Sequence, residues 1–384
     1  MNTPSIREPQ YEYQNESSDF NDGVIACAHG HLALGLDNGF VLFDYPELRL
    51  LLDEPDIFPP DNNCDGIQLS KTHLIALGSL VSQSISFDWK VLLKWFPIGS
   101  TDCSKELYLG KGYWHLVKRL NGNELVVYES LWRDQIMSID TRTARIRWRI
   151  DSPQLRRLDY CGNGYLIGLC RDSKFLLIRL DSGKIIEKFH ISNYKVNRYT
   201  CATYVDGYYV AGGFTSHRSQ YVLACIKPGT LEILWETKNS LVSHFHESLV
   251  AGRLEEDEDG VYLPDIHHIS NIMYDRLRNG YVCTLGGGGV EMGACRGAAA
   301  ITFIDSLQKS PWKSLVLNEE IGVSGLISTD DNSYVVSVYG KVYVINLGAD
   351  GEMPDISVQR NQSLSWIRSI INFASHLVKN RSLE

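Results

Sequence analysis

A short pattern of two hydrophobic strands joined by a polar turn occurs seven times along the 384-residue chain. The first strands begin at His31, His73, Glu124, Tyr165, Tyr208, Tyr281 and Tyr334. The second strands are predicted to begin at Gly39, Ser84, Gln135, Phe175, Tyr221, Ala299 and Lys341. The pairs follow one another at roughly 40 to 50 residues, which is typical of four-stranded propeller blades. The longest step, between Tyr209 and Val282, predicts an insertion at about 240–270.

Composition agrees with a fold built from strands. Hydrophobic residues make up 44% of the chain and charged residues 22%, and the 20 Tyr and 8 Trp favour strands. A small four-stranded sheet cannot cover both of its own faces, so neighbouring sheets must pack face to face around an axis. A helical solenoid would need a 3.6-residue periodicity, which these segments lack. The predicted fold class is therefore all-β, a seven-bladed β-propeller with a C-terminal amphipathic helix.

The repeats divide the chain into four predicted parts. These are a disordered polar tail over 1–20, the propeller over 21–350, a connector over 351–362 and an amphipathic helix over 363–384. The ring could be closed by a strand from the N-terminal region or by the segment that begins at Asp355. The sequence does not choose between these alternatives.

Several second strands end in an apolar residue followed by Asp. These endings are Phe43-Asp44, Ile139-Asp140, Leu180-Asp181 and Ile304-Asp305. They resemble a degenerate form of the Trp-Asp ending of WD40 blades. The turn that follows resembles the quinoprotein-type repeat, Asp-x-x-Thr-Gly with Trp four residues later. The matching residues are Asp140, Thr143, Trp148 and, in the Gly place, Ala144, with weaker matches at Thr230 with Trp235 and at Asp181 with Phe189.

This WD40-like and quinoprotein-like resemblance, over residues 21–350, implies a propeller fold. A large aromatic ring in the outer strand has a structural reason, because it can pack against the next blade and bury apolar area. Quinoprotein enzymes such as methanol dehydrogenases carry an adjacent Cys-Cys pair and a calcium-bound cofactor. The nine cysteines here include no adjacent pair. A redox enzyme is therefore not expected, and no cofactor is predicted.

Two unusual segments lie in and after the insertion. The stretch LGGGGVEMGACRGAAA at 285–300 could allow close approach of a ligand or of another backbone, but it lacks the Lys and the Ser or Thr of a phosphate-binding loop. The insertion carries His244, His246, His267 and His268, whose spacing does not define a metal site, so no metal is predicted. Its acidic run, which includes Glu255, Glu256 and Asp257, is either a solvated loop or a patch that meets a basic partner.

The last twenty residues show helical spacing of apolar side chains. Trp366, Ile367, Ile370 and Ile371 belong to this apolar face, and Ser363 is a plausible N-cap. An isolated helix of this length is marginal in water, so its apolar face needs a surface to cover it. That surface could be the propeller itself, a partner protein or, less favoured, a membrane.

Charge and termini limit the function further. The net charge of -9 and pI of about 5.7 provide no general basic footprint for nucleic acid. The N-terminal sequence has no signal-peptide pattern, which predicts a cytoplasmic or nuclear protein. No local constellation indicates catalysis, so we predict a non-catalytic protein-interaction scaffold or adaptor in a multi-subunit complex. Two alternatives remain, a ligand binder or enzyme that uses the axial channel and a propeller recruited to membranes by its C-terminal helix.

Overall fold

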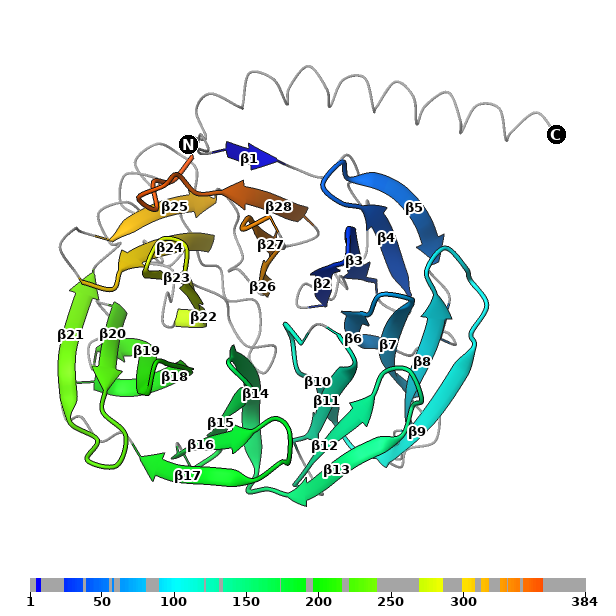
Figure 1. Ribbon diagram of the computed structural model, residues 1–384, viewed down its shortest axis with the longest axis horizontal. Helices are drawn as coiled ribbons and strands as arrows, with labels where there is room; N and C mark the ends of the chain where they lie inside the picture. The colour runs from blue at the N-terminus through cyan, green and yellow to red at the C-terminus, as the bar shows by residue number, and fades with distance from the viewer. Residues whose placement is uncertain are drawn as a thin grey trace, which may run out of the picture.

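Seven four-stranded antiparallel sheets surround a central axis in the computed structural model (Figure 1). Within each of the first six sheets the strands follow chain order from the axis to the circumference, which confirms the predicted all-β, seven-bladed propeller. The predicted helix over 363–384 lies outside the described part. The structure describes residues 5–7, 24–36, 39–54, 57–58, 63–80, 90–120, 122–130, 134–172, 174–190, 196–215, 221–239, 269–285, 299–307, 312–317, 325–329, 331–338 and 341–354.

We number the blades I to VII in chain order. Blade I comprises β2 (Ile25–Ala28), β3 (His31–Gly35), β4 (Phe40–Asp44) and β5 (Arg49–Glu54). Blade II comprises β6 (Asn63–Leu69), β7 (His73–Leu80), β8 (Lys90–Pro97) and β9 (Lys105–Lys111). Blade III comprises β10 (Trp114–Leu116), β11 (Glu124–Glu129), β12 (Gln135–Asp140) and β13 (Ile146–Asp151). Blade IV comprises β14 (Leu155–Gly162), β15 (Tyr165–Cys170), β16 (Lys174–Arg179) and β17 (Ile185–His190). Blade V comprises β18 (Val196–Val205), β19 (Tyr208–Thr215), β20 (Tyr221–Ile226) and β21 (Ile233–Asn239). Blade VI comprises β22 (Ile269–Asp275), β23 (Gly280–Leu285), β24 (Ala299–Asp305) and β25 (Lys313–Leu317). Blade VII comprises β26 (Gly325–Ser328), β27 (Tyr334–Val338), β28 (Lys341–Asn346) and, from the N-terminal end of the chain, β1 (Ser5–Arg7).

Six of the seven predicted second strands are confirmed, and the one in blade II is wrong. The partner of β7 is β8, which begins at Lys90 rather than at Ser84. The physical reason is visible in the alternation of β8, where Val91, Leu93 and Trp95 are each buried. This period of two gives the strand one fully apolar face, which the blade interface requires.

Blade VII joins the two ends of the propeller. Its outer strand β1 pairs antiparallel with β28, with Ile6 opposite Ile345. Of the two ways to close the ring, the structure therefore uses the N-terminal strand. The prediction that 1–20 is a disordered tail is wrong for these three residues, because β28 would otherwise leave an open row of backbone hydrogen-bonding groups at its edge.

The hydrophobic core is distributed between the blades rather than collected at one centre. Over the described residues there are seven apolar clusters, and each joins two consecutive blades around the ring. Between blades II and III, for example, Trp95 from β8 and Trp114 from β10 lie in one fully buried cluster. Each blade is thus held by its neighbours on both sides.

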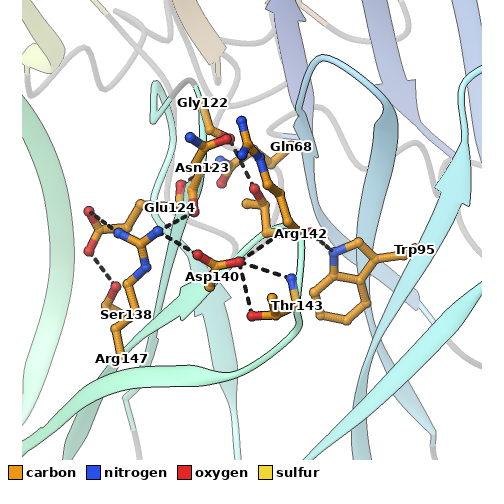
Figure 2. A network of polar contacts seen from close by, with 11 residues as sticks. Gln68, Trp95, Gly122, Asn123, Glu124, Ser138, Asp140, Arg142, Thr143 and Arg147 are labelled. Atoms are coloured by element: carbon orange, nitrogen blue, oxygen red, sulfur yellow. Dashed lines mark hydrogen bonds and ion pairs between the residues drawn. The ribbon is translucent and has the colours of Figure 1, made fainter.

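The turn after β12 shows why the quinoprotein-like sequence recurs (Figure 2). The Asp140 carboxylate accepts hydrogen bonds from the backbone N–H groups of Arg142 and Thr143 and from the Thr143 hydroxyl, and it pairs with Arg147. These donors hold the pKa of Asp140 well below its usual value, and the contact with Arg147 is the largest cause. Ala144 stands at φ 58°, in the left-handed region that Gly adopts without strain. The motif therefore encodes a tight turn.

The same turn and the start of β11 contact the preceding blade. The Trp95 indole N–H of blade II donates to the carbonyl of Thr141 at 2.8 Å, and the Gln68 amide donates to the carbonyl of Glu124 at 2.8 Å (Figure 2). These two bonds satisfy polar groups inside the joint between blades II and III.

The outer-strand aromatic residues pack against the following blade, as the resemblance implied. The indole N–H of Trp148 in blade III donates to the Leu180 carbonyl of blade IV at 2.7 Å. Phe189 of blade IV stacks on Tyr209 of blade V with 4.0 Å between ring centroids, and Trp235 of blade V lies 6.1 Å from Tyr281 of blade VI. The prediction that these residues serve packing is confirmed.

We expect removal of β1 to open the ring. Deleting residues 1–10 should lower the free energy of unfolding by about 2 kcal/mol or more, because several backbone hydrogen bonds, each contributing about 0.5–1.5 kcal/mol, are lost at once. Thermal or urea unfolding measures the change. Deletion of residues 1–4 alone is the control and should leave stability nearly unchanged. Equal stability of both truncated chains would contradict closure by β1.

Substitutions at two glycines allow the cost of backbone strain to be measured apart from the cost of a packing clash. Gly183 and Gly164 both have positive φ, but a Cβ at Gly183 would lie 2.6 Å from the Trp148 ring whereas a Cβ at Gly164 meets nothing within 4 Å. We expect Gly164→Ala to cost about 1 kcal/mol through φ strain, and Gly183→Ala to cost about 1–3 kcal/mol more through the clash. Chemical denaturation measures both, and equal losses would contradict the position of Trp148.

Candidate functional site: a basic cluster on the propeller axis

Three basic side chains gather at the axis from blades III and IV. Lys118 and Arg119 follow β10, and Arg157 lies on β14, the innermost strand of blade IV. After Leu116 one more residue continues the pairing, since the Val117 N–H donates to the carbonyl of Val126 at 2.8 Å. The chain then leaves the sheet, and Arg119 adopts φ 71°. We call Lys118, Arg119, Arg157 and the nearby Asp159 the axial cluster.

Arg119 reaches across the ring. Its Nε donates to the Leu326 carbonyl at 3.2 Å and its Nη1 donates to the Ile272 carbonyl at 3.1 Å. Leu326 lies on β26 of blade VII and Ile272 on β22 of blade VI, both opposite blade III in the ring (Figure 1). The Arg119 side chain therefore spans the axis and links three blades.

Arg157 is brought to the same place by an irregularity in its strand. The register of β14 against β15 shifts between Leu155 and Arg157, and such bulges re-aim side chains. Its Nη2 donates to Asp159 Oδ1 at 3.0 Å and to Asn271 Oδ1 at 2.9 Å, and its Nε also pairs with Asp159. Arg157 and Asp159 can pair in this way because residues two apart share one face of a strand.

Asn271 is oriented toward both guanidinium groups. Its amide nitrogen donates to the Thr284 hydroxyl at 2.8 Å, which leaves Oδ1 to accept from Arg157 and, at 3.5 Å, from Arg119. Asn271 also follows a register shift, between Ile269 and Asn271. The same shift occurs at the corresponding position of blade II and of blade V, before Gly66 and Cys201. A recurring bulge thus selects which residue of the inner strand faces the axis.

The electrostatics of the axial cluster are dominated by positive charge. The pKa of Lys118 is lowered to about 8, mainly by burial and also by the charges of Arg157 and Arg119, while Asp159 acts in the opposite direction. For Asp159, burial would raise the pKa, but Arg157, Arg119 and Lys118 outweigh it and hold the pKa below its usual value. Lys118 and Arg119 are half-buried, and the side chain of Arg157 is 26% exposed, so solvent reaches the cluster.

Such a cluster can bind but shows no catalytic arrangement among its named members. Guanidinium and ammonium groups donate hydrogen bonds to anions, and Arg presents a planar fork that fits carboxylate or phosphate. Within the described ranges, no group of three or more His, Cys, Asp or Glu residues is placed to hold a metal ion.

The residues predicted from sequence to bind partners lie outside the described part of the chain. They are Glu255, Glu256, Asp257, Trp366, Ile367, Ile370 and Ile371, and the histidines of the insertion and the glycine-rich stretch 286–297 lie outside it as well. Their attachment points are described. Ile269 pairs with Leu285, and Leu285 pairs with Ala300, so the insertion and the glycine-rich stretch both join blade VI at the same end of its strands.

We expect the Arg157–Asp159 pair to stabilise the ring. Asp159→Ala should lower the free energy of unfolding by about 3 kcal/mol, because it leaves a largely buried guanidinium without its carboxylate. The exposed pair of Asp172 with Lys174 provides the control, and Asp172→Ala should cost less than about 1 kcal/mol. Denaturation at several pH values measures both.

The pH dependence of the Asp159 effect follows from the direction of its pKa. Because the folded-state pKa lies below the unfolded one, the carboxylate stabilises the fold above about pH 4, and this stabilisation is lost as the pH falls further. The deficit of the Asp159→Ala variant should therefore shrink in acid. A deficit independent of pH would contradict the ion pair.

Comparison with known proteins supports the architecture. No protein-family model matches the chain, and no curated protein sequence matches it. Among solved structures, a chain of a crystal structure of the mitotic checkpoint complex superimposes with a TM-score of 0.56 at 10% sequence identity, covering 89% of this chain and 94% of that one. BamB from Moraxella catarrhalis matches with a TM-score of 0.47 at 12% identity, covering 84% and 82%. The chain has the fold of a seven-bladed WD40-like β-propeller.

Proposed function

We propose that this propeller is a non-catalytic protein-interaction scaffold that docks a partner protein on one face of blades V and VI. The observation that carries the proposal is a set of exposed apolar side chains on neighbouring turns. Leu277 is 67% exposed, Leu307 61% and Tyr208 42%, and the two leucines are the most exposed large apolar residues among those described. We call these three residues the turn surface.

The contacts beneath the turn surface place its members side by side. Leu277 lies in the β22–β23 turn with Asn279, whose carbonyl accepts a hydrogen bond from the N–H of Ser306, the residue before Leu307, at 3.1 Å. The Tyr274 hydroxyl donates to Asn279 Oδ1 at 2.6 Å. Burial raises the pKa of Tyr274, and the charge of Asp206, two residues before Tyr208, raises it further. The turns of blades V and VI therefore adjoin.

The chemistry of the turn surface favours a protein over a membrane or a nucleic acid. Among the residues that the structure describes in these turns, the exposed charged ones are Arg276 and Asp206, which have opposite signs. A lipid or phosphate surface would call for a cluster of basic residues around the leucines. An apolar centre with a mixed polar rim that includes Tyr and Arg is typical of the part of an interface that contributes most binding energy. The occupant that fits is a protein segment with apolar side chains at its centre.

Two further predictions from sequence remain predictions. The predicted C-terminal helix, residues 363–384, lies outside the described part of the chain, and we propose it as a second docking element. In the described residues no helix is long and apolar enough to cross a membrane. A cytoplasmic or nuclear location is likewise proposed.

The test is quantitative affinity purification from the native cell with the full chain and two double variants. The first double variant, Leu277→Asp with Leu307→Asp, replaces the two exposed leucines of the turn surface by carboxylates. Leu50→Asp with Ile146→Asp changes two exposed apolar residues on the outer strands of blades I and III and is the matched control. We expect at least one protein recovered with the wild type and the control to fall tenfold or more with the turn-surface variant. Unfolding curves should show that all three chains are folded.

Two results would contradict the proposal. The same partners at the same yields from all three chains would show that the turn surface is not the docking site. The absence of any stable partner with the wild type would count against the scaffold itself.

A further inference from the structure

We propose that the outer strand of blade III binds an acidic, extended segment of a partner protein. This strand is β13, and its outer edge pairs with no other strand in the described part of the chain. Four exposed basic residues gather at this edge, and we call them the basic edge: Lys105, Arg142, Arg145 and Arg149. The inference goes beyond the proposed docking on blades V and VI, since it concerns other blades and a partner of different chemistry.

The positive charge of the basic edge is locally unbalanced. Positions 142–149 hold four arginines and no carboxylate, although the net charge of the chain is -9. Arg147 pairs with a carboxylate inside its own turn (Figure 2), whereas the other three guanidinium groups form no ion pair or hydrogen bond with any described residue. Within the described ranges, no ion pair joins the basic edge to the exposed carboxylates that flank it along the chain, which are Asp102, Glu106 and Asp151.

The basic edge is assembled from two blades. The strands β9 and β13 are consecutive on the circumference of the ring (Figure 1), and Lys105 Nζ donates to the carbonyl oxygen of Arg142. Arg149 lies directly opposite Met137, which belongs to the apolar cluster between blades II and III. Directly opposite residues share one face of a sheet, so Arg149 lies on the side of blade III that faces blade II. The four positive charges are therefore on the same side of the edge strand.

The backbone of β13 also presents hydrogen-bonding groups at its outer edge. In an antiparallel pair, residues that bond to the partner strand alternate with residues whose N–H and C=O point away from it. The Ser152 N–H donates to the carbonyl of Asp134, which directly precedes β12. Ile150, two residues earlier, lies opposite Ile136 and has the same phase. The N–H and C=O of Arg149 therefore point away from β12, where an extended peptide can pair with them.

An acidic peptide fits the basic edge better than a nucleic acid does. The guanidinium fork forms paired, charge-assisted hydrogen bonds with carboxylates. A nucleic acid would extend past these four cations, and a chain with a net charge of -9 repels a long phosphate backbone. The outward backbone groups of β13 suit a peptide, whose own N–H and C=O groups are complementary to them. The partner segment we expect therefore carries several Asp or Glu residues in an extended conformation.

Protection of the edge strand is the structural alternative. Charged side chains on an exposed strand also prevent the edge-to-edge association of sheets. That role needs no ligand, and it predicts that loss of the arginines promotes self-association without any effect on a bound peptide. Peptide binding therefore separates the two roles.

The experiment is fluorescence anisotropy of the full chain with a labelled ten-residue peptide in which Glu alternates with Thr. The reference probe is the same peptide with Gln at every Glu position. We expect saturable binding of the acidic peptide, at least tenfold tighter than that of the Gln peptide, and weaker as salt is added. Arg145→Gln with Arg149→Gln should weaken binding of the acidic peptide tenfold or more.

The matched control is Arg49→Gln with Lys227→Gln. It removes the same charge from exposed positions of blades I and V, so it should bind the acidic peptide as the wild type does. All of the substituted side chains are exposed, and unfolding curves should show that both variants are folded. Sedimentation of the same samples reports any self-association.

Three results would overturn the proposal. The first is the absence of saturable binding of the acidic peptide by the wild type, and the second is unchanged affinity in Arg145→Gln with Arg149→Gln. The third is a ten-nucleotide single-stranded DNA that binds more tightly than the peptide and is lost in the same variant, which would assign the basic edge to nucleic acid.

This test and the test of the turn surface can fail separately. Leu277→Asp with Leu307→Asp leaves the basic edge intact and should bind the acidic peptide as the wild type does. The purification control for the turn surface includes Ile146→Asp, which adds a carboxylate to β13. A protein lost only with that control would therefore bind at the basic edge, and a protein lost only with the leucine variant would bind at the turn surface.

Discussion

The apolar contact between the facing sides of consecutive blades is the interaction on which the whole structure depends. In the described part of the chain no blade has a core of its own, since each of the seven apolar clusters found there draws side chains from two neighbouring sheets. Burial of apolar area stabilises by about 25 cal/mol per Å², so a blade with only one neighbour would lose a large part of its stabilisation. This condition makes closure of the ring a requirement, and β1 meets it by pairing with β28.

The repeating elements were predictable because they obey a period. Strands such as β3 and β23 have apolar sequences bounded by turn residues, and Asp140, Thr143 and Trp148 keep the spacing of a tight turn followed by a packing aromatic. The error at Ser84 arose where two hydrophobic runs compete within one segment. The strand that pairs with β7 begins at Lys90, and Val91 and Trp95 are selected by their burial in the cluster between blades II and III, which the sequence alone does not show.

The axial cluster was not predictable, for a different physical reason. A bulge places two residues opposite one, so alternation cannot show that Arg157 faces the axis instead of Arg156. Arg119 lies outside any regular strand and finds its partners in blades VI and VII, more than 150 positions away along the chain. A weak signal was present in Lys118 and Arg119, two adjacent cations directly after an inner strand. The residues proposed from sequence as partner-binding, such as Glu255 and Trp366, remain predictions.

The turn surface and the axial cluster each draw residues from more than one blade, so the position of both depends on closure of the ring. Hydrogen–deuterium exchange of the full chain tests that closure most directly. We expect the backbone amides of Ser5–Arg7 to be protected together with those of Lys341–Asn346, because they belong to one sheet. Exchange of the amides of Ser5–Arg7 at the rate of an unstructured peptide would contradict it.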